Sequence, residues 1–579
     1  MKNVKREDNM SKRSLTAVLA SAAIAAITAS CLNVSVHAAT KKPDSPAAVT
    51  GGRQLWNGYS VFFQHPPILE FKVAEAAEYK ATATFDGKTL ELGFLSHHNG
   101  PRVDLTPIWD KIPANSIVKV ECTALGVAKS SVGREIKESD SRTFMKTAPF
   151  RAGSYPPPKE DYTRAALRIY DYVFDSPALK AFRETGKPDK SYKKNCYPSK
   201  MYSSLILMCE RYAAARPERR REVLDFAYLL ADYLISIAQP AGTPLEYLPP
   251  TYALGFGHPV AKQYAGQTMM HYPAQAGTAL AALARYSKGD SPERSAKYLD
   301  FAEKIAGTFL RLQGEDGTWY ARLSEKTGLP DVMKNTEDVR VRKAGGVDVT
   351  RNRAIPLSMI KMFESVYALT GKAEYRRAAD KAAAYMERPD GPLSTYNWEG
   401  QFEDGPPTPP YMNLTMNSPC GYATWRLARS PGDKAVVKSM RKLLSFIEDQ
   451  FVVWERPVTA DGKYLTKDDC PQLDENWAWR LLTAPEWHVP GVMEQFDCYN
   501  PIDCHTAKTA KLYMALYKAC GEKEYREKAK ALCDSIVNAT PDDGNMPTHW
   551  MGKYGEKWEN WYNCMIETAM TLEELAKDL

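Results

Sequence analysis

The chain has 579 residues, of which 44% are hydrophobic and 25% are charged. This composition is ordinary for a folded protein, and the length allows either two domains or one large domain with a full hydrophobic core. The formal net charge is only +6 and no dense block of Lys and Arg is present, which argues against a nucleic-acid partner.

The first 38 residues match the pattern of a secretory signal peptide. Basic residues in MSKRS (10–14) precede the apolar run LTAVLASAAIAAITA (15–29), which is too short and too Ala-rich for a good membrane anchor. The VHA triplet places cleavage after Ala38, and the alternative is a lipid anchor on Cys31, whose preceding residues fit a lipidation signal poorly. We therefore expect an exported protein without a membrane span, in the bacterial periplasm or at the cell surface.

Residues 39–52 are expected to be a flexible leader, and residues 53–150 have the period-two pattern of β-strands. The segment KATATFDGKTLEL contains a hairpin signal at Asp86-Gly87, and SIVKVECTAL alternates apolar and polar residues. These patterns predict a small β-sandwich domain that ends at the Pro-rich segment GSYPPPKEDY (153–162).

From residue 160 to residue 579 the hydrophobic period is 3.6 residues. Charged amphipathic helices, such as SAKYLDFAEKIAGTFLRLQ, follow blander Ala-rich helices across short turns. The blander helices are expected to begin near residues 201, 274, 353, 421, 505 and 562, which is an internal repeat of helical hairpins. Six hairpins predict a closed ring, with the blander helices as its inner wall. The short RPERRR segment is expected to be the solvated face of a helix.

The connections from outer to inner helices are long, for example 314–352 and 455–504. Long ordered loops within a compact domain are usually functional. All of them lead to the starts of inner helices, so we expect a site at that end of the ring.

One motif connects this pattern to known enzymes. The segment LQGEDGTWY (312–320) closes an outer helix and resembles the Gln-x-x-Asp-Gly-x-Trp signature of six-hairpin α/α-toroid carbohydrate-active enzymes. That group includes glycoside hydrolases, polysaccharide lyases and sugar epimerases, and an N-terminal β-domain is common in it. The resemblance covers about residues 160–579 and implies a mainly α (α/α)6 toroid. Within this group the chain resembles the β-glucuronidase-type secreted toroids, although the hallmark residues of unsaturated-glucuronyl hydrolases are not found.

The segment GVMEQFDCYNPIDCH (491–505) leads into the fifth inner helix and carries three acids, two cysteines, a tyrosine and a histidine. Hydrolysis of a glycosidic bond needs two carboxyl groups. Glu494 is the first candidate, and Asp348 or Asp503 is the second. The alternatives are that Glu494 caps a helix or forms a salt bridge, that Asp503 caps a helix, and that Asp348 only pairs with Arg351.

Elimination at a uronate needs a different set of groups. A Tyr or His removes the C5 proton, while Arg or Asn neutralises the carboxylate. His271 and Tyr272 are the catalytic candidates for this reaction, and Arg351 and Asn352 would hold the carboxylate. The alternative for His271 is a structural, hydrogen-bonded histidine.

Several helix N-termini and arginines are expected to point into one cavity, which would suit an anionic glycan. Tryptophans in loops are candidates to stack on sugar rings. The predicted substrate-binding residues are Arg351, Asn352, Glu399, Trp398, Trp487, His488, Tyr499 and His505.

No metal site and no cofactor are predicted. Cys498, Cys504 and His505 lie close in sequence, but their spacing matches no zinc pattern, so a disulfide or buried thiols are preferred.

The leading hypothesis is a secreted glycoside hydrolase that acts on a uronic-acid-containing glycan. The runner-up is a polysaccharide lyase with a His/Tyr base, and the third is a noncatalytic glycan-binding protein. An epimerase is the least favoured, because the toroidal epimerases that the chain resembles are mostly cytoplasmic.

Overall fold

The computed structural model groups Leu55–Leu579 into one compact unit, apart from Met1–Gln54. All that follows concerns the unit Leu55–Leu579. It describes residues 55–58, 60–76, 78–96, 101–127, 135–330, 353–396, 398, 419–458, 461–465, 469, 487–495, 498–552 and 559–579. The predicted signal peptide and leader lie outside these residues, and the predicted domain boundaries stay predictions.

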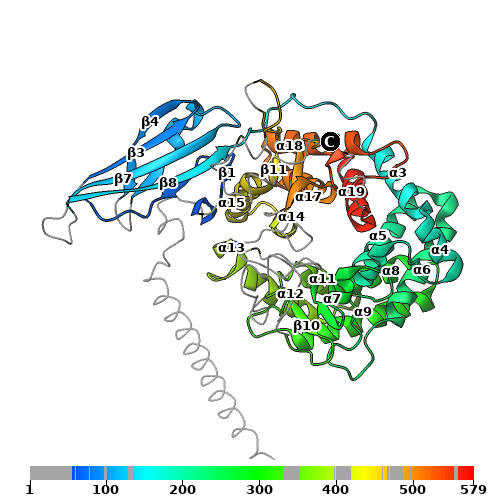
Figure 1. Ribbon diagram of the computed structural model, residues 1–579. Coiled ribbons are helices and arrows are strands. Elements are labelled where there is room, and N and C mark those ends of the chain that lie inside the picture. The colour runs from blue at the N-terminus through cyan, green and yellow to red at the C-terminus, as the bar shows by residue number, and fades with distance from the viewer. Residues whose placement is uncertain are drawn as a thin grey trace, which may run out of the picture. The chain divides into compact units, whose positions relative to one another are not determined.

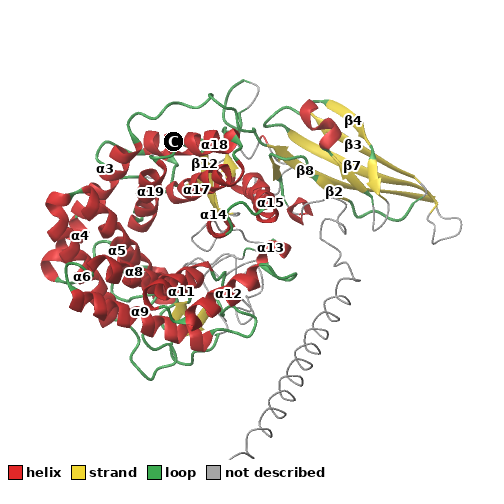
Figure 2. Ribbon diagram, turned by 180° about the vertical axis from the view of Figure 1, so that it is seen from behind, coloured by secondary structure: helices red, strands yellow, loops and turns green. Residues whose placement is uncertain are grey.

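The β-region contains two sheets (Figure 2). A five-stranded sheet has the order β1-β8-β7-β3-β4 and a three-stranded sheet has the order β2-β6-β5. The strands are β1 (Phe62–Phe63), β2 (Ile68–Glu70), β3 (Glu78–Phe85), β4 (Lys88–Leu92), β5 (Phe94–Ser96), β6 (Arg102–Asp104), β7 (Ile117–Val127) and β8 (Glu135–Lys146).

The predicted hairpin and alternation in this region are confirmed. Asp86 and Gly87 join β3 to β4 with positive φ angles of 47° and 73°, the backbone that a two-residue hairpin requires. On β7, Val118, Val120 and Cys122 are all buried, as a period of two predicts. The β-region therefore buries one face of its main sheet.

The chain from residue 162 onward forms a ring of paired helices (Figure 1). The inner helices are α5 (Pro198–Ala215), α8 (His271–Ser287), α11 (Leu357–Thr370), α14 (Pro419–Arg429), α17 (Asp503–Cys520) and α19 (Tyr562–Leu575). Their outer partners are α6 (Arg220–Ser236), α9 (Pro292–Leu312), α12 (Ala373–Met386), α15 (Lys434–Phe451), α18 (Lys523–Ala539) and α3 (Tyr162–Asp175).

The inner helices close on themselves, so the (α/α)6 fold predicted from the sequence is confirmed. Helices α8, α5, α19 and α17 pack in succession, with α11 beside α8 and α14 beside α17. The ring closes between α14 and α11, where the Trp425 Nε1–H donates to Glu364 Oε2 at 3.0 Å. The first helix, α3, packs on the last one, α19, and completes the sixth pair.

The remaining described elements are short. The helices are η1 (Leu55–Gly58), η2 (Thr106–Lys111), α4 (Pro177–Thr185), η3 (Lys193–Cys196), η4 (Pro217–Arg219), α7 (Pro259–Gln263) and α13 (Pro392–Thr395). The strands are β9 (Gln267–Met269), β10 (Arg322–Ser324), β11 (Val452–Val453), β12 (Gly491–Gln495) and β13 (Cys498–Pro501). Among the described residues, none of the helices has the length and apolar character needed to cross a bilayer.

The Gln-x-x-Asp-Gly-x-Trp motif ties the end of α9 to the next outer helix. The Gln313 side-chain amide donates to the carbonyls of Gly317 at 2.8 Å and Ala378 at 3.0 Å. Gly317 has a φ of 96°, and a Cβ there would lie 2.4 Å from the Lys381 carbonyl oxygen. Trp319 is buried and donates to the Phe309 carbonyl at 2.8 Å. The motif therefore has a structural role, because it holds the turn after α9 against α12.

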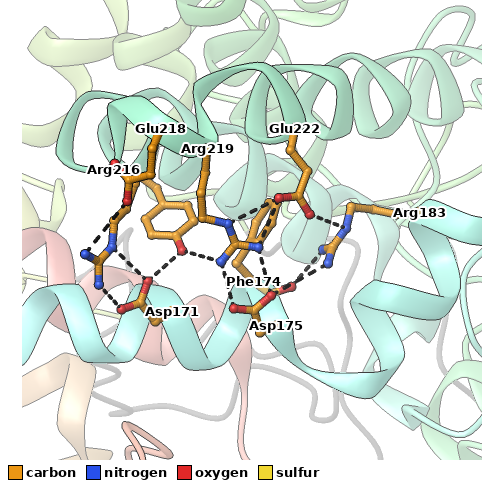
Figure 3. A network of polar contacts seen from close by, with 9 residues as sticks. Asp171, Phe174, Asp175, Arg183, Arg216, Glu218, Arg219 and Glu222 are labelled. Atoms are coloured by element: carbon orange, nitrogen blue, oxygen red, sulfur yellow. Dashed lines mark hydrogen bonds and ion pairs between the residues drawn. The ribbon is translucent and has the colours of Figure 1, made fainter.

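A network of ion pairs fastens α3 to the turn between α5 and α6 (Figure 3). The Arg219 guanidinium donates to both oxygens of Asp175, at 2.7 and 2.9 Å, and lowers the pKa of that carboxyl. Arg216 pairs with Asp171 in the same way. The predicted solvated face of RPERRR therefore also carries ion pairs, because Arg216 and Arg219 are partly exposed and bind the two aspartates.

Candidate functional site

A cavity of about 120 Å³ lies where α5, α8, α17 and α19 begin, beside strand β12. Four of the predicted site residues line it, namely Glu494, His271, Tyr272 and His505. His271 and Tyr272 lie far from Glu494 and His505 in sequence, so the fold brings these two segments together as the ring predicts. The predicted site residues meet because each long connection leads to the start of an inner helix, and these starts lie at one end of the ring.

Glu494 lies on β12, so the alternative that it caps a helix does not hold. The pairing of β12 with β13 shifts register between Met493 and Gln495, which are the two neighbours of Glu494. Register irregularities in a strand pair, of which the β-bulge is one, can redirect a side chain, and β-bulges are common beside active sites. Glu494 lines the cavity from this irregular position.

Two lysines give the cavity positive charge. The Lys200 ammonium lies 4.1 Å from the ring centre of Trp561 and 5.6 Å from that of Tyr272, which are cation–π distances. Lys508, one turn into α17, also lines the cavity. Two lysines and the starts of four helices therefore lie at the cavity beside the carboxyl groups of Glu494 and Glu567, while the predicted Arg351 lies outside the described residues.

A second carboxylate, Glu567, also lines the cavity. Burial alone would raise the pKa of Glu567, but Lys511, Lys508 and Lys361 outweigh burial and lower this pKa to about 2. Its Oε1 lies 3.4 Å from the Lys511 Nζ. Glu567 is therefore ionised at neutral pH.

His505 has a defined tautomer. Its Nδ1 lies 3.1 Å from the Met493 carbonyl oxygen, which only accepts, so Nδ1 carries the proton and Nε2 the lone pair. Burial lowers the pKa of His505 well below its usual value. The ring is therefore a neutral base at the wall of the cavity.

His271 and Tyr272 begin α8, and their ring centres lie 3.9 Å apart. Both side chains are buried. The two neighbouring rings therefore line the cavity from the start of α8.

Asp503 is the first residue of α17, and Ile502 holds the N-cap position, so the helix-cap alternative for Asp503 does not hold. The Asp503 side chain is 0% exposed, and burial raises the pKa of its carboxyl well above the usual value. It does not line the cavity, whereas the adjacent thiols of Cys504 and Cys564 do. A hydrogen bond with Cys564 lowers the pKa of the Cys504 thiol.

The structure separates Trp487 and His488 from this group. They line a second cavity of about 900 Å³, together with His549 and Trp550, and none of the described residues lines both cavities. His488 Nε2–H donates to the Ser535 carbonyl at 2.8 Å, which is a structural bond. Sequence reasoning grouped these two residues with the rest because they lie in the same long connection.

Trp398 is also placed differently from the prediction. Its side chain is 1% exposed and packs against Tyr422, so it offers no face for a sugar in this structure. Asp348, Arg351, Asn352 and Glu399, together with the side chain of Tyr499, lie outside the described residues.

Sequence reasoning missed several residues that line the cavity, including Lys200, Lys508, Trp561, Cys564 and Glu567. A helical period would have found Lys508, because it follows the predicted residue His505 by three positions and so shares a helix face with it.

No family model and no curated protein matches the sequence. Similar solved structures include a family 76 glycoside hydrolase from a bovine Bacteroides thetaiotaomicron strain, 11% identical, covering 89% of this chain and 97% of that chain, with a TM-score of 0.40. Cellobiose 2-epimerase from Spirochaeta thermophila is 13% identical, covering 72% and 98%, with a TM-score of 0.45. An unsaturated glucuronyl hydrolase specific for heparin is 10% identical, covering 72% and 96%, with a TM-score of 0.38.

These similar structures are carbohydrate-active enzymes, the class that the sequence resemblance implies.

Proposed function

We propose that the chain is an exported glycoside hydrolase that cleaves a uronic-acid-containing glycan in the cavity at the inner-helix starts. The observation that carries the proposal is that two carboxyl groups, of Glu494 and Glu567, line one cavity together with two lysines. Paired carboxyls are what glycosidic hydrolysis requires.

The two carboxyls would have different roles. Glu567 stays ionised because three lysines lower its pKa, so it would stabilise the positive charge that develops on the sugar ring. Glu494 would be the acid that protonates the departing glycosidic oxygen, and a water molecule would then add to the anomeric carbon and give its proton to the Glu494 carboxylate. Lys200 and Lys508 would bind the uronate carboxylate, which is the reason for proposing an anionic glycan.

A polysaccharide lyase is the second candidate, and the His505 tautomer favours it. With Nδ1–H bound to the Met493 carbonyl, Nε2 is available to accept the C5 proton of a uronate. The two lysines would neutralise the uronate carboxylate, and expulsion of the C4 oxygen would leave a carbon–carbon double bond between C4 and C5. This reaction needs no second carboxyl.

One assay separates the two reactions. The purified protein is incubated with a panel of uronate-containing oligosaccharides, and new reducing ends and the ultraviolet absorbance of unsaturated uronates are measured together. Reducing ends without absorbance support hydrolysis, whereas absorbance that rises in step supports the lyase. The absence of both signals across the panel contradicts cleavage of such glycans and leaves glycan binding to be measured.

Variants then assign the residues. For a hydrolase, Glu494→Gln lowers kcat by about 100- to 10,000-fold while oligosaccharide binding is retained. For a lyase, His505→Gln is the damaging change, and Glu494→Gln keeps most of the turnover.

A further inference from the structure

We infer that Asp503, Cys504 and Cys564 bind one Zn²⁺ ion at the wall of the cavity. This inference departs from the sequence-based expectation that the chain has no metal site. It does not depend on which reaction the cavity performs.

The three side chains meet in one place although they come from two helices. One carboxylate oxygen of Asp503 and the Sγ atoms of Cys504 and Cys564 all lie within 4.8 Å of one another. In tetrahedral zinc sites the Zn–S distance is about 2.3 Å and the Zn–O distance about 2.0–2.2 Å, which places ligand atoms roughly 3.5–3.8 Å apart. Side-chain shifts of about 1 Å are therefore enough to close the three groups around an ion.

The Asp503 carboxylate points to a missing partner. The side chain is 0% exposed, and neither oxygen forms a hydrogen bond with any residue that the structure describes. A buried carboxyl group whose oxygens form no hydrogen bond is costly and rare in native proteins. The backbone N–H of Cys504 and the hydroxyl of Thr568 lie close enough to favour the ionised form, but not in hydrogen-bonding geometry. A cation held between the carboxylate and the two sulfurs explains this arrangement.

The ligand set selects the kind of metal. Two thiolates and one carboxylate favour a thiophilic divalent ion, and Zn²⁺ is the commonest such ion in sites of this composition. The amide of Asn563 lies 3.6 Å from the Cys564 Sγ and is placed to support a thiolate. The complex would carry a net charge of −1, which Lys200 and Lys508 in the same cavity would balance.

The fourth coordination position would face the cavity, because both cysteines line it. Zinc sites with three protein ligands keep such a position for water or for a ligand atom. Binding would release the thiol protons, so zinc affinity is expected to rise with pH.

The test measures metal content in the whole chain, without any glycan. The purified protein is loaded with Zn²⁺, dialysed against metal-free buffer and analysed for bound zinc. In parallel, Co²⁺ loading reports thiolate ligation through its near-ultraviolet charge-transfer band. We expect about one ion per chain and a clear thiolate band. Asp503→Asn should weaken zinc binding by at least about 10- to 100-fold, and Cys504→Ala or Cys564→Ala should abolish the band.

Cys533→Ala is the matched control, because Cys533 is a buried thiol on the outer helix α18. It should retain the metal content of the natural protein. The Co²⁺ spectrum of the unaltered chain keeps the test valid even if a variant fails to fold. Absence of the thiolate band, equal metal content in all variants, or a disulfide between Cys504 and Cys564 in the purified protein would each overturn the inference.

Discussion

The Glu448 carboxylate lies 2.8 Å from the Lys528 ammonium, and the two side chains are only 3% and 10% exposed. The Tyr513 hydroxyl donates to the same oxygen at 2.8 Å, and the other oxygen lies 2.9 Å from His65 Nε2. One glutamate on α15 therefore connects α17, α18 and the β-region through groups that are largely removed from water.

Removal of Lys528 should destabilise the protein strongly. Lys528→Met leaves the Glu448 charge buried without its main partner, so we expect a loss of about 3–5 kcal/mol in the free energy of unfolding. Urea unfolding measures this loss. Lys523→Met, at the exposed start of the same helix, is the control and should change stability by less than about 0.5 kcal/mol. Equal stabilities of the two variants would show that the buried pair contributes nothing.

The same cluster should make stability fall at alkaline pH. Burial alone would lower the pKa of His65, but Asp449 and Glu448 outweigh it and raise this pKa to about 9. A raised histidine pKa contributes stability below pH 6.5 that is lost as pH rises through 9. The effect is moderated by solvent, because the His65 side chain is 42% exposed.

His65→Gln tests this dependence. Unfolding free energies measured between pH 6 and 10 should fall less steeply in the variant than in the natural protein. Glu448 and Lys528 both stay charged between pH 6 and 10. The pKa of Glu448 is lowered to about 2, and the pKa of Lys528 is raised. An unchanged slope would contradict the proposed titration of His65.

Most of the fold follows from periodicity. The inner helices predicted near residues 353 and 562 begin at Leu357 and Tyr562, because a 3.6-residue pattern depends only on local sequence. Periodicity does not predict the pairing of α3 with α19, since these two helices lie at opposite ends of the helical part of the chain. Their pairing follows from closure of the ring.

The site was predicted less completely. Glu494, His271 and His505 lie on one cavity because helix starts meet at one end of the ring. Trp487 and His488 share a connection with Glu494 but lie on another cavity, since sequence proximity does not determine which way a loop turns. The cluster of Asp503 with Cys564 was also hidden, because its members belong to helices whose packing the sequence does not state.

Lys200 should determine the preference for anionic glycans. Lys200→Met removes a cation from the cavity wall, so we expect the KM for a uronate-containing substrate to rise about 10-fold or more. Binding of a neutral oligosaccharide should change little. Lys288→Met, at an exposed position after α8, is the control. A parallel loss of affinity for both glycans would contradict a role in charge recognition.

Gln313 should stabilise the fold without contributing to catalysis. Its amide donates two hydrogen bonds, to Gly317 and to Ala378 on α12, and no part of it lines the described cavities. Gln313→Glu replaces the donor with a carboxylate facing two carbonyl oxygens, so we expect a loss of about 2–4 kcal/mol in the free energy of unfolding. Glu315→Gln, at an exposed position in the same turn, should have almost no effect. Because Gln313 lines neither of the two described cavities, the folded Gln313 variant should keep its kcat and KM. A large fall in kcat per folded molecule would place this motif in the catalytic machinery instead.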